Sequence, residues 1–161
     1  MKQRTITAVG ATLGFALPLL AQEVGTDETE IDLSEVPPAV MEAARNAVDV
    51  EFTYAKTERE PGGLTYELGG ETADGLNVEV DLLEDATVEE VERELASMDD
   101  VPAEIRDALM ADFDDFEAEM IEEIWVNERV LRYEFEGTAG GEAKVVEVTA
   151  LGDILDVTDE D

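Results

Sequence analysis

The chain has 161 residues, and its 43 acidic side chains against 10 basic ones give a formal net charge of −33 at pH 7. This charge argues against a DNA- or RNA-binding surface, because phosphates are bound by Lys and Arg, and anionic membranes would repel it. The chain contains no His and no Cys, which excludes disulfides, thiol redox chemistry, conventional zinc sites and nucleophilic triads built on either residue. Hydrophobic residues make up 44% of the chain, so we expect a folded core beneath an acidic shell rather than disorder.

The N-terminus has the pattern of a secretory signal peptide. Lys2 and Arg4 supply positive charge, 6–20 is an uncharged and mostly apolar run, and Ala21 provides a small residue before the cleavage point. The run is shorter than the ~20 apolar residues of a spanning helix, which favours cleavage over the alternative of a membrane anchor. We therefore predict a signal peptide at 1–21, a periplasmic or secreted protein, and no stable membrane insertion after cleavage. Loss of the two positive charges would take the net charge from −33 to −35.

The next part of the chain is expected to contain a leader, a helix and three strands. The segment 22–34 is acidic and lacks periodicity, which predicts a flexible leader. Pro37 and Pro38 suit a first helical turn, and the apolar residues after them keep helical spacing to about Asp49. Alternating apolar residues then predict strands, separated by turn signals, at 50–55, 64–68 and 76–82.

The middle of the chain is predicted to hold a pair of helices. Thr87 and Glu90 resemble a capping box, and the apolar residues within 84–98 are spaced for a helix. Pro102 begins the next helix, in which Ile105 and Leu109 lie on one apolar stripe. This pair of helices would join the two halves of the mature chain.

The second half is expected to continue in strands. They are predicted at 117–127, 130–136, 143–150 and 154–157, and the tail at 158–161 is expected to fray. The fold class is therefore α+β, with two tandem α-β-β-β units, each an antiparallel sheet of three to four strands with its helix on one face. The first unit, with its linking helix, would span 35–98 and the second 99–161.

Three segments of the first unit return in the second in the same order. The segments 36–43, 64–70 and 78–80 correspond to 101–108, 131–137 and 146–148, with offsets of 65, 67 and 68 residues. Such a drift is what changes in loop length produce. The pattern indicates a duplicated supersecondary unit, with Gly69-Gly70 and Gly140-Gly141 expected in turns at strand ends.

The ordered set of motifs resembles the PepSY family of small exported domains. The residues that carry the resemblance are Tyr66-Glu67-Leu68, Asp74-Gly75 and Val78-Glu79-Val80, then Tyr133-Glu134-Phe135, Gly140-Gly141, Val146-Glu147-Val148 and Gly152-Asp153-Ile154-Leu155. In tandem form they are similar to the PepSY-like group related in architecture to β-lactamase inhibitory proteins, over 35–157. The first unit departs from the pattern, since it lacks the glycine turn after its third strand. The resemblance implies a non-catalytic exported module that binds or inhibits other proteins, with no catalytic residues and no cofactor.

Three residues are the candidates for a partner-binding site. Trp125 has no aromatic counterpart in the first unit, and Arg129 and Arg132 flank the same hairpin. The alternative is that Trp125 packs in the core and that the arginines pair with neighbouring carboxylates. Tyr54, Tyr66 and Tyr133 share the core alternative because they all lie in predicted strands.

Calcium is the other ligand that the sequence suggests. A dense acidic cluster contains Asp112, Asp114, Asp115, Glu117 and Glu119. It is not an EF-hand, because the sixth loop position, which requires Gly, would be Glu117. Weak surface binding of calcium stays possible from the density of oxygen ligands.

The sequence therefore favours an exported, non-catalytic binding or inhibitor-like module whose acidic surface steers a basic protein or peptide toward it. An acidic calcium-binding protein is the alternative. An acidic mimic of nucleic acid is less favoured because the chain is expected to be exported, and an enzyme is least favoured because His and Cys are missing. Surface acidity that serves only solubility or adaptation to salt is the simplest explanation of the charge.

Overall fold

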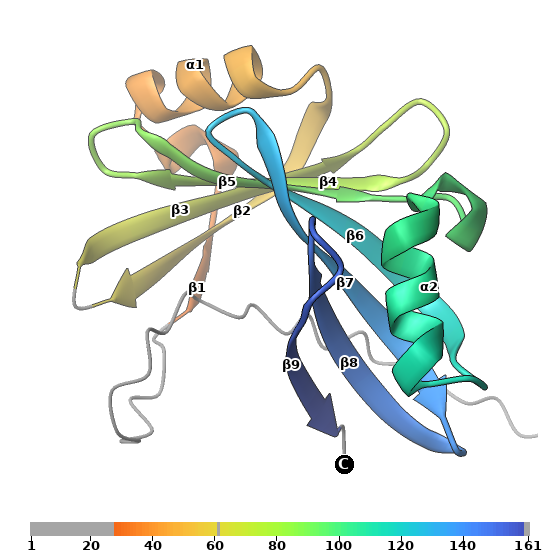
Figure 1. Ribbon diagram of the computed structural model, residues 1–161. Coiled ribbons are helices and arrows are strands. Elements are labelled where there is room, and N and C mark those ends of the chain that lie inside the picture. The colour runs from red at the N-terminus through yellow and green to blue at the C-terminus, as the bar shows by residue number, and fades with distance from the viewer. Residues whose placement is uncertain (1–27, 61, 160–161) are drawn as a thin grey trace, which may run out of the picture.

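The computed structural model describes residues 28–60 and 62–159, and the expected signal peptide lies outside them. The described residues form one antiparallel sheet whose nine strands follow chain order, with two α-helices (Figure 1). The strands are β1 (Thr29–Ile31), β2 (Glu51–Glu60), β3 (Gly63–Glu71), β4 (Asn77–Leu83), β5 (Val88–Glu94), β6 (Glu117–Val126), β7 (Arg129–Ala139), β8 (Glu142–Thr149) and β9 (Ile154–Asp159). The helices are α1 (Pro38–Ala47) and α2 (Ala103–Asp112), each preceded by a short 3-10 helix, η1 (Leu33–Glu35) or η2 (Met98–Asp100).

Both α-helices start at the prolines that predicted them. Pro37 and Pro102 are the N-caps of α1 and α2, because a proline needs no intrahelical partner for its nitrogen at this place. Val40 and Ala44 of α1 are buried, and they lie one turn apart, as the predicted apolar stripe requires.

The segment predicted to be a linking helix is a strand, and this prediction was wrong. Val88 and Val91 are three residues apart, which suggested helical periodicity. In the sheet Val88 lies opposite Leu82, and Val91 lies opposite Val80. Between these two pairs β5 contains one residue more than β4, so the register shifts there. A bulge of this kind lets residues three apart share one face of a strand.

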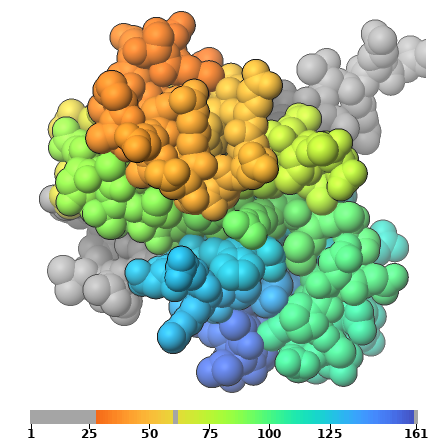
Figure 2. All heavy atoms as spheres, turned by 90° about the horizontal axis from the view of Figure 1, so that it is seen from above, coloured from red at the N-terminus to blue at the C-terminus, as the bar shows by residue number. Residues whose placement is uncertain are grey.

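β5 also joins the two predicted tandem sheets into one continuous sheet, a point that the sequence leaves open. Its residues 91–94 pair with 122–125 of β6. Figure 1 shows that the sheet bends between its halves and that both helices lie on the outer side of the bend. Figure 2, seen from the side of α1, shows α1 over the first half and the β6–β7 hairpin emerging between the two helices.

Two cores lie beneath the helices on the same face of the sheet. The first contains Val40 of α1 with Leu68 and Val80, and the second contains Ile105 of α2 with Phe135. Neither helix among the described residues is long and apolar enough to cross a membrane.

Both ends of the described chain are more ordered than expected. The predicted leader includes β1, which pairs with β2 from Thr29–Thr57 to Ile31–Ala55. The tail predicted to fray from 158 onward still pairs with β8 as far as Asp159.

Glycines opposite bulges occur at matching places in the two halves. Gly70 lies within β3, not in the expected turn, opposite the bulge of β2, and Gly137 lies opposite the bulge of β6. A Cβ atom at Gly70 would lie 2.3 Å from the backbone oxygen of Glu51, and one at Gly137 would lie 2.2 Å from that of Glu117. Only glycine therefore permits this approach of the strands.

Candidate functional site: the open face of the sheet

The candidate site lies on the face of the sheet that carries no helix, here called the open face. Strands that cover a core alternate apolar and polar residues. In β4, Val78 and Val80 are buried beneath α1, while Glu79 and Asp81 point to the other side. The same alternation and register place carboxylates of strands β3 to β9 on the open face. They include Glu67, Glu79, Asp81, Glu90, Glu92, Glu94, Glu122, Glu134, Glu136, Glu147 and Asp156.

Several of these carboxylates lie directly opposite one another in neighbouring strands. Glu79 faces Glu92, while Glu134 faces both Glu122 and Glu147. Like charges at such positions repel each other, and burial further disfavours the ionised form. The arrangement therefore favours protonated carboxyl groups along the middle of the open face.

The pKa values follow this arrangement. Burial, with Glu136 as the next cause, raises the pKa of Glu122 to about 7. Burial, followed by Glu122 and Glu147, raises the pKa of Glu134 to about 7 as well. Burial and the facing Glu122 hold the pKa of Glu92 well above its ordinary range. Glu122 and Glu134 therefore exchange protons near neutral pH, where ordinary glutamates are fully ionised, while Glu92 stays protonated there.

Two basic side chains interrupt the row of carboxylates. The Nζ atom of Lys56 lies 2.6 Å from Oε1 of Glu67. Arg132 donates two hydrogen bonds to Glu90, at 2.8 and 3.1 Å, and its Nε lies 3.6 Å from Oε1 of Glu147. Arg132 is 5% exposed and pairs with neighbouring carboxylates, which is the alternative that the sequence left open for it.

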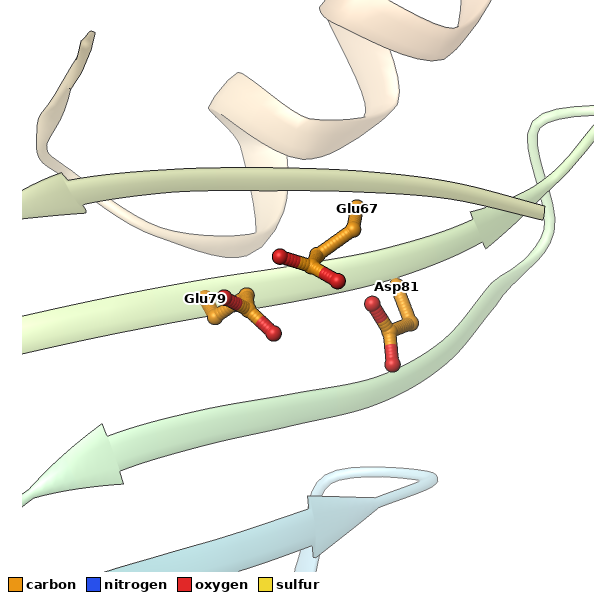
Figure 3. Close-up of side chains that lie close together, drawn as sticks. All are labelled: Glu67, Glu79 and Asp81. Atoms are coloured by element: carbon orange, nitrogen blue, oxygen red, sulfur yellow. The ribbon is translucent and has the colours of Figure 1, made fainter. Parts of the chain in front are cut away.

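At one end of the open face, three carboxylates converge. Glu67, Glu79 and Asp81 each offer an oxygen within 4.8 Å of the others, and Figure 3 shows these side chains together. The hydroxyl of Tyr54 donates to Glu79 at 2.5 Å, and its ring occupies the space that a side chain at Gly69 would fill.

This trio is electrostatically strained when ionised. Burial, followed by Glu67 and Glu90, raises the pKa of Asp81 to about 8. Burial and Glu67 likewise raise the pKa of Glu79, although the bond from Tyr54 opposes that shift. Oδ1 of Asp81 is buried and has no hydrogen-bond partner. A cation placed here would favour the ionised carboxylates and release protons.

The structure does not bring the three predicted partner-binding residues together. Trp125 is half-buried on the helix side, packed against the core beneath α1, with the guanidinium of Arg93 5.1 Å from its ring centroid. Arg129 is exposed at the start of β7, whereas Arg132 faces Glu90 on the opposite, open face. A groove of about 600 Å³ lies beside Trp125, between α1, β5 and the β6–β7 turn.

The acidic cluster for which the sequence left weak calcium binding open is a set of exposed side chains at the connection between α2 and β6. Its members are Asp112, Asp114, Asp115, Glu117 and Glu119. The carboxylate of Asp115 accepts a hydrogen bond from the backbone of Gly140 at 3.0 Å. Among the described residues, the group of three carboxylates close enough to share a cation lies elsewhere, on the open face.

The open face was missed because it depends on strand register. Glu67 and Glu79 belong to the motifs Tyr66-Glu67-Leu68 and Val78-Glu79-Val80, whose alternation already places them away from the core. The signal was therefore present in each strand. The convergence of these side chains required the pairing of β3 with β4 and of β4 with β5.

Comparisons with known proteins extend to the fold alone. No protein-family model matches the sequence, and no curated protein matches it. A DUF2874 family protein from Bacteroides uniformis has a similar structure, with a TM-score of 0.63 and 13% identity, over 77% of this chain and 89% of that one. A protein from Bacteroides eggerthii, described as a candidate periplasmic protein, has a TM-score of 0.63 and 16% identity, over 76% of this chain and 88% of that one. A BLIP-like protein from Bacteroides fragilis has a TM-score of 0.59 and 22% identity, over 77% of this chain and 87% of that one.

Proposed function

We propose that this protein is a non-catalytic binding module of the periplasm, PepSY-like in character, that holds a basic segment of another protein against its open face. The observation that carries the proposal is the row of carboxylates from β3 to β9, arranged on a helix-free face of one sheet. The signal-peptide pattern and the periplasmic description of one protein of similar fold support the location.

The chemistry of the row favours a basic occupant. A lysine or arginine of the partner would stabilise the ionised forms of Glu92, Glu122 and Glu134, whose pKa values are raised by burial and by other carboxylates. Lys56 and Arg132 already show this type of pairing within the chain. Complementary charge would also speed the encounter of the two proteins.

An inhibitory role is the specific form of binding that we favour. The BLIP-like name of one protein with a similar fold supports it, as does the resemblance to the PepSY-like group. The bend of the sheet places the open face on its inner side (Figure 1), which suits a protruding loop of a partner.

The fold is proposed to derive from duplication of a helix and four strands. The order α1-β2-β3-β4-β5 is followed by α2-β6-β7-β8-β9. Gly70 and Gly137 lie opposite bulges at corresponding places, which supports a common origin.

The proposal is tested with two variants, in each of which three carboxyl groups are replaced by amides. One carries Glu92→Gln, Glu122→Gln and Glu134→Gln on the open face, and the other neutralises exposed carboxylates on the helices. The control substitutions are Glu42→Gln, Glu104→Gln and Asp107→Asn. Wild type and control should capture the same protein from periplasmic extract, and the open-face variant should lose it. Undiminished capture by both variants would place binding elsewhere. Equally weakened capture by both would mean that binding depends only on net charge.

A second candidate function is binding of a divalent cation such as calcium. The convergence of Glu67, Glu79 and Asp81, with Oδ1 of Asp81 lacking a hydrogen-bond partner, favours it. Hard cations prefer such oxygen ligands. Calcium titration by calorimetry should then release protons near pH 7 and fail in Asp81→Asn, while Asp115→Asn behaves as wild type. Loss of calcium binding in Asp115→Asn would instead place the calcium site in the exposed cluster between α2 and β6.

A further inference from the structure

A second surface, separate from the open face, lies at the β9 edge of the sheet. β9 is the last strand in the sheet order, and within the described ranges no strand pairs with its outer side. It is six residues long, compared with three for β1 at the other edge. An exposed edge offers unpaired backbone groups to an incoming strand.

Exposed apolar residues gather at this edge. The exposed large hydrophobic residues of the described chain are Leu131 (41% exposed), Leu151 (88%), Leu155 (55%) and Val157 (41%). Leu155 and Val157 are in β9, Leu151 is in the β8–β9 turn, and Leu131 is hydrogen-bonded through its carbonyl oxygen to that turn. Clustered exposure of this kind commonly marks a contact surface.

The β8–β9 turn is held in a defined shape. Oγ1 of Thr149 accepts hydrogen bonds from the backbone of Leu151 at 3.2 Å and of Asp153 at 3.0 Å. The backbone nitrogen of Ala150 donates to the oxygen of Leu131 at 3.0 Å. The exposed position of Leu151 therefore belongs to a hydrogen-bonded turn.

Charge at the edge indicates what kind of strand it fits. Asp153, Asp156 and Asp159 lie on or beside β9 and are exposed. Lys144 on β8 is already paired with Asp159 and lies 3.7 Å from a carboxylate oxygen of Glu142. The edge is thus apolar and acidic, without a basic residue in β9 itself.

We infer that the β9 edge binds, by strand addition, an extended segment of another protein in which apolar and basic residues alternate. Its backbone would pair with β9, its apolar residues would lie beside Val157, and its basic residues would lie beside Asp156 on the other face. A second copy of this chain fits poorly, because two strands bearing Asp156 and Asp159 would meet in chains of net charge −33. The inference does not depend on the function proposed for the open face.

Strand addition is tested with a fluorescent peptide of alternating Val and Lys. Two further peptides carry N-methyl groups on alternate residues, in one register or the other. A strand directs successive N–H groups to opposite edges, so one methylated peptide should lose at least about tenfold in affinity, while the other binds like the parent. Amides of β9 should gain protection from hydrogen exchange when the parent peptide binds.

A protein variant provides the second arm. Leu155→Lys with Val157→Lys should weaken peptide binding at least about tenfold. The helix control variant with Glu42→Gln, Glu104→Gln and Asp107→Asn, whose substitutions lie on α1 and α2 and not on β9 or the open face, should bind the peptide as before. Equal binding of both methylated peptides, or unchanged β9 protection, would overturn strand addition. Sedimentation that shows a dimer of the protein alone, lost in the Leu155/Val157 variant, would assign the edge to a second copy instead.

Discussion

Replacement of Asp81 by Asn should stabilise the protein at neutral pH and reduce its sensitivity to pH. The folded protein raises the pKa of Asp81 from 3.8 to about 8, through burial and then through Glu67 and Glu90. Between these two pKa values the folded state holds a proton that the unfolded state has lost. The contribution of Asp81 to stability is therefore greatest below pH 3.8, its pKa in the unfolded state, and is lost as the pH rises toward about 8, its pKa in the folded state.

The magnitude follows from one proton. Each pH unit costs roughly 1.4 kcal/mol of unfolding free energy, or about 3 kcal/mol between pH 5 and pH 7. The Asn side chain of Asp81→Asn cannot ionise. Between pH 5 and pH 7 the variant should therefore lose about 3 kcal/mol less unfolding free energy than wild type. Asp107→Asn makes the same chemical substitution at an exposed position of α2 and should leave the slope unchanged.

The assay is urea unfolding at several pH values between 5 and 8, at constant high ionic strength to suppress general charge repulsion. Wild type should lose stability as pH rises, because Glu79, Glu92, Glu122 and Glu134 also have raised pKa values. Equal slopes for wild type and Asp81→Asn, or a wild-type stability that rises with pH, would refute the reasoning.

Other substitutions test the ion pair, the bulge and the core. Arg132→Met should cost about 3–5 kcal/mol by leaving Glu90 uncompensated, and addition of Glu90→Gln should recover part of it in a double-mutant cycle. Gly137→Ala should destabilise by at least about 2 kcal/mol because its Cβ would meet backbone, while Gly62→Ala meets nothing and should be nearly neutral in thermal unfolding. Leu68→Ala should cost about 2–5 kcal/mol in urea unfolding, and a smaller loss would contradict its place in the first core.

The features of the fold that depend on local pattern could be predicted from the sequence. The prolines that cap α1 and α2, the apolar stripe of Val40 and Ala44, and the alternation of Val78 and Val80 each act within one element. Those predictions agree with the structure. The α+β class also follows, because it needs only the order and type of elements.

The features that depend on register could not be predicted. Val88 and Val91 read as helical because the bulge that places them on one face involves β4 as well as β5. The same strand then pairs with β6, which makes the two tandem sheets continuous, and no local pattern indicates that pairing. The partner of Arg132 could not be identified either, since nothing local to it reveals that Glu90, 42 residues earlier, lies within hydrogen-bond distance.

The candidate site shows the same division. The alternating glutamates of Tyr66-Glu67-Leu68 and Tyr133-Glu134-Phe135 are visible in the sequence, but the abundance of carboxylates hides which of them meet. The structure separates the exposed cluster around Asp115 from the partly buried row on the open face. Burial and opposition across strands, rather than the number of acidic residues, distinguish the two.

The measurement that tests this account most directly is a carbon-13 NMR titration of the side-chain carboxyls of Glu122 and Glu134. We expect midpoints at about 7 for both, because each is buried among other carboxylates of the open face. Addition of the captured basic partner should lower both midpoints. Midpoints near the ordinary glutamate value of about 4.3, unchanged by the partner, would contradict the claim that this face is a proton-holding site for a basic ligand.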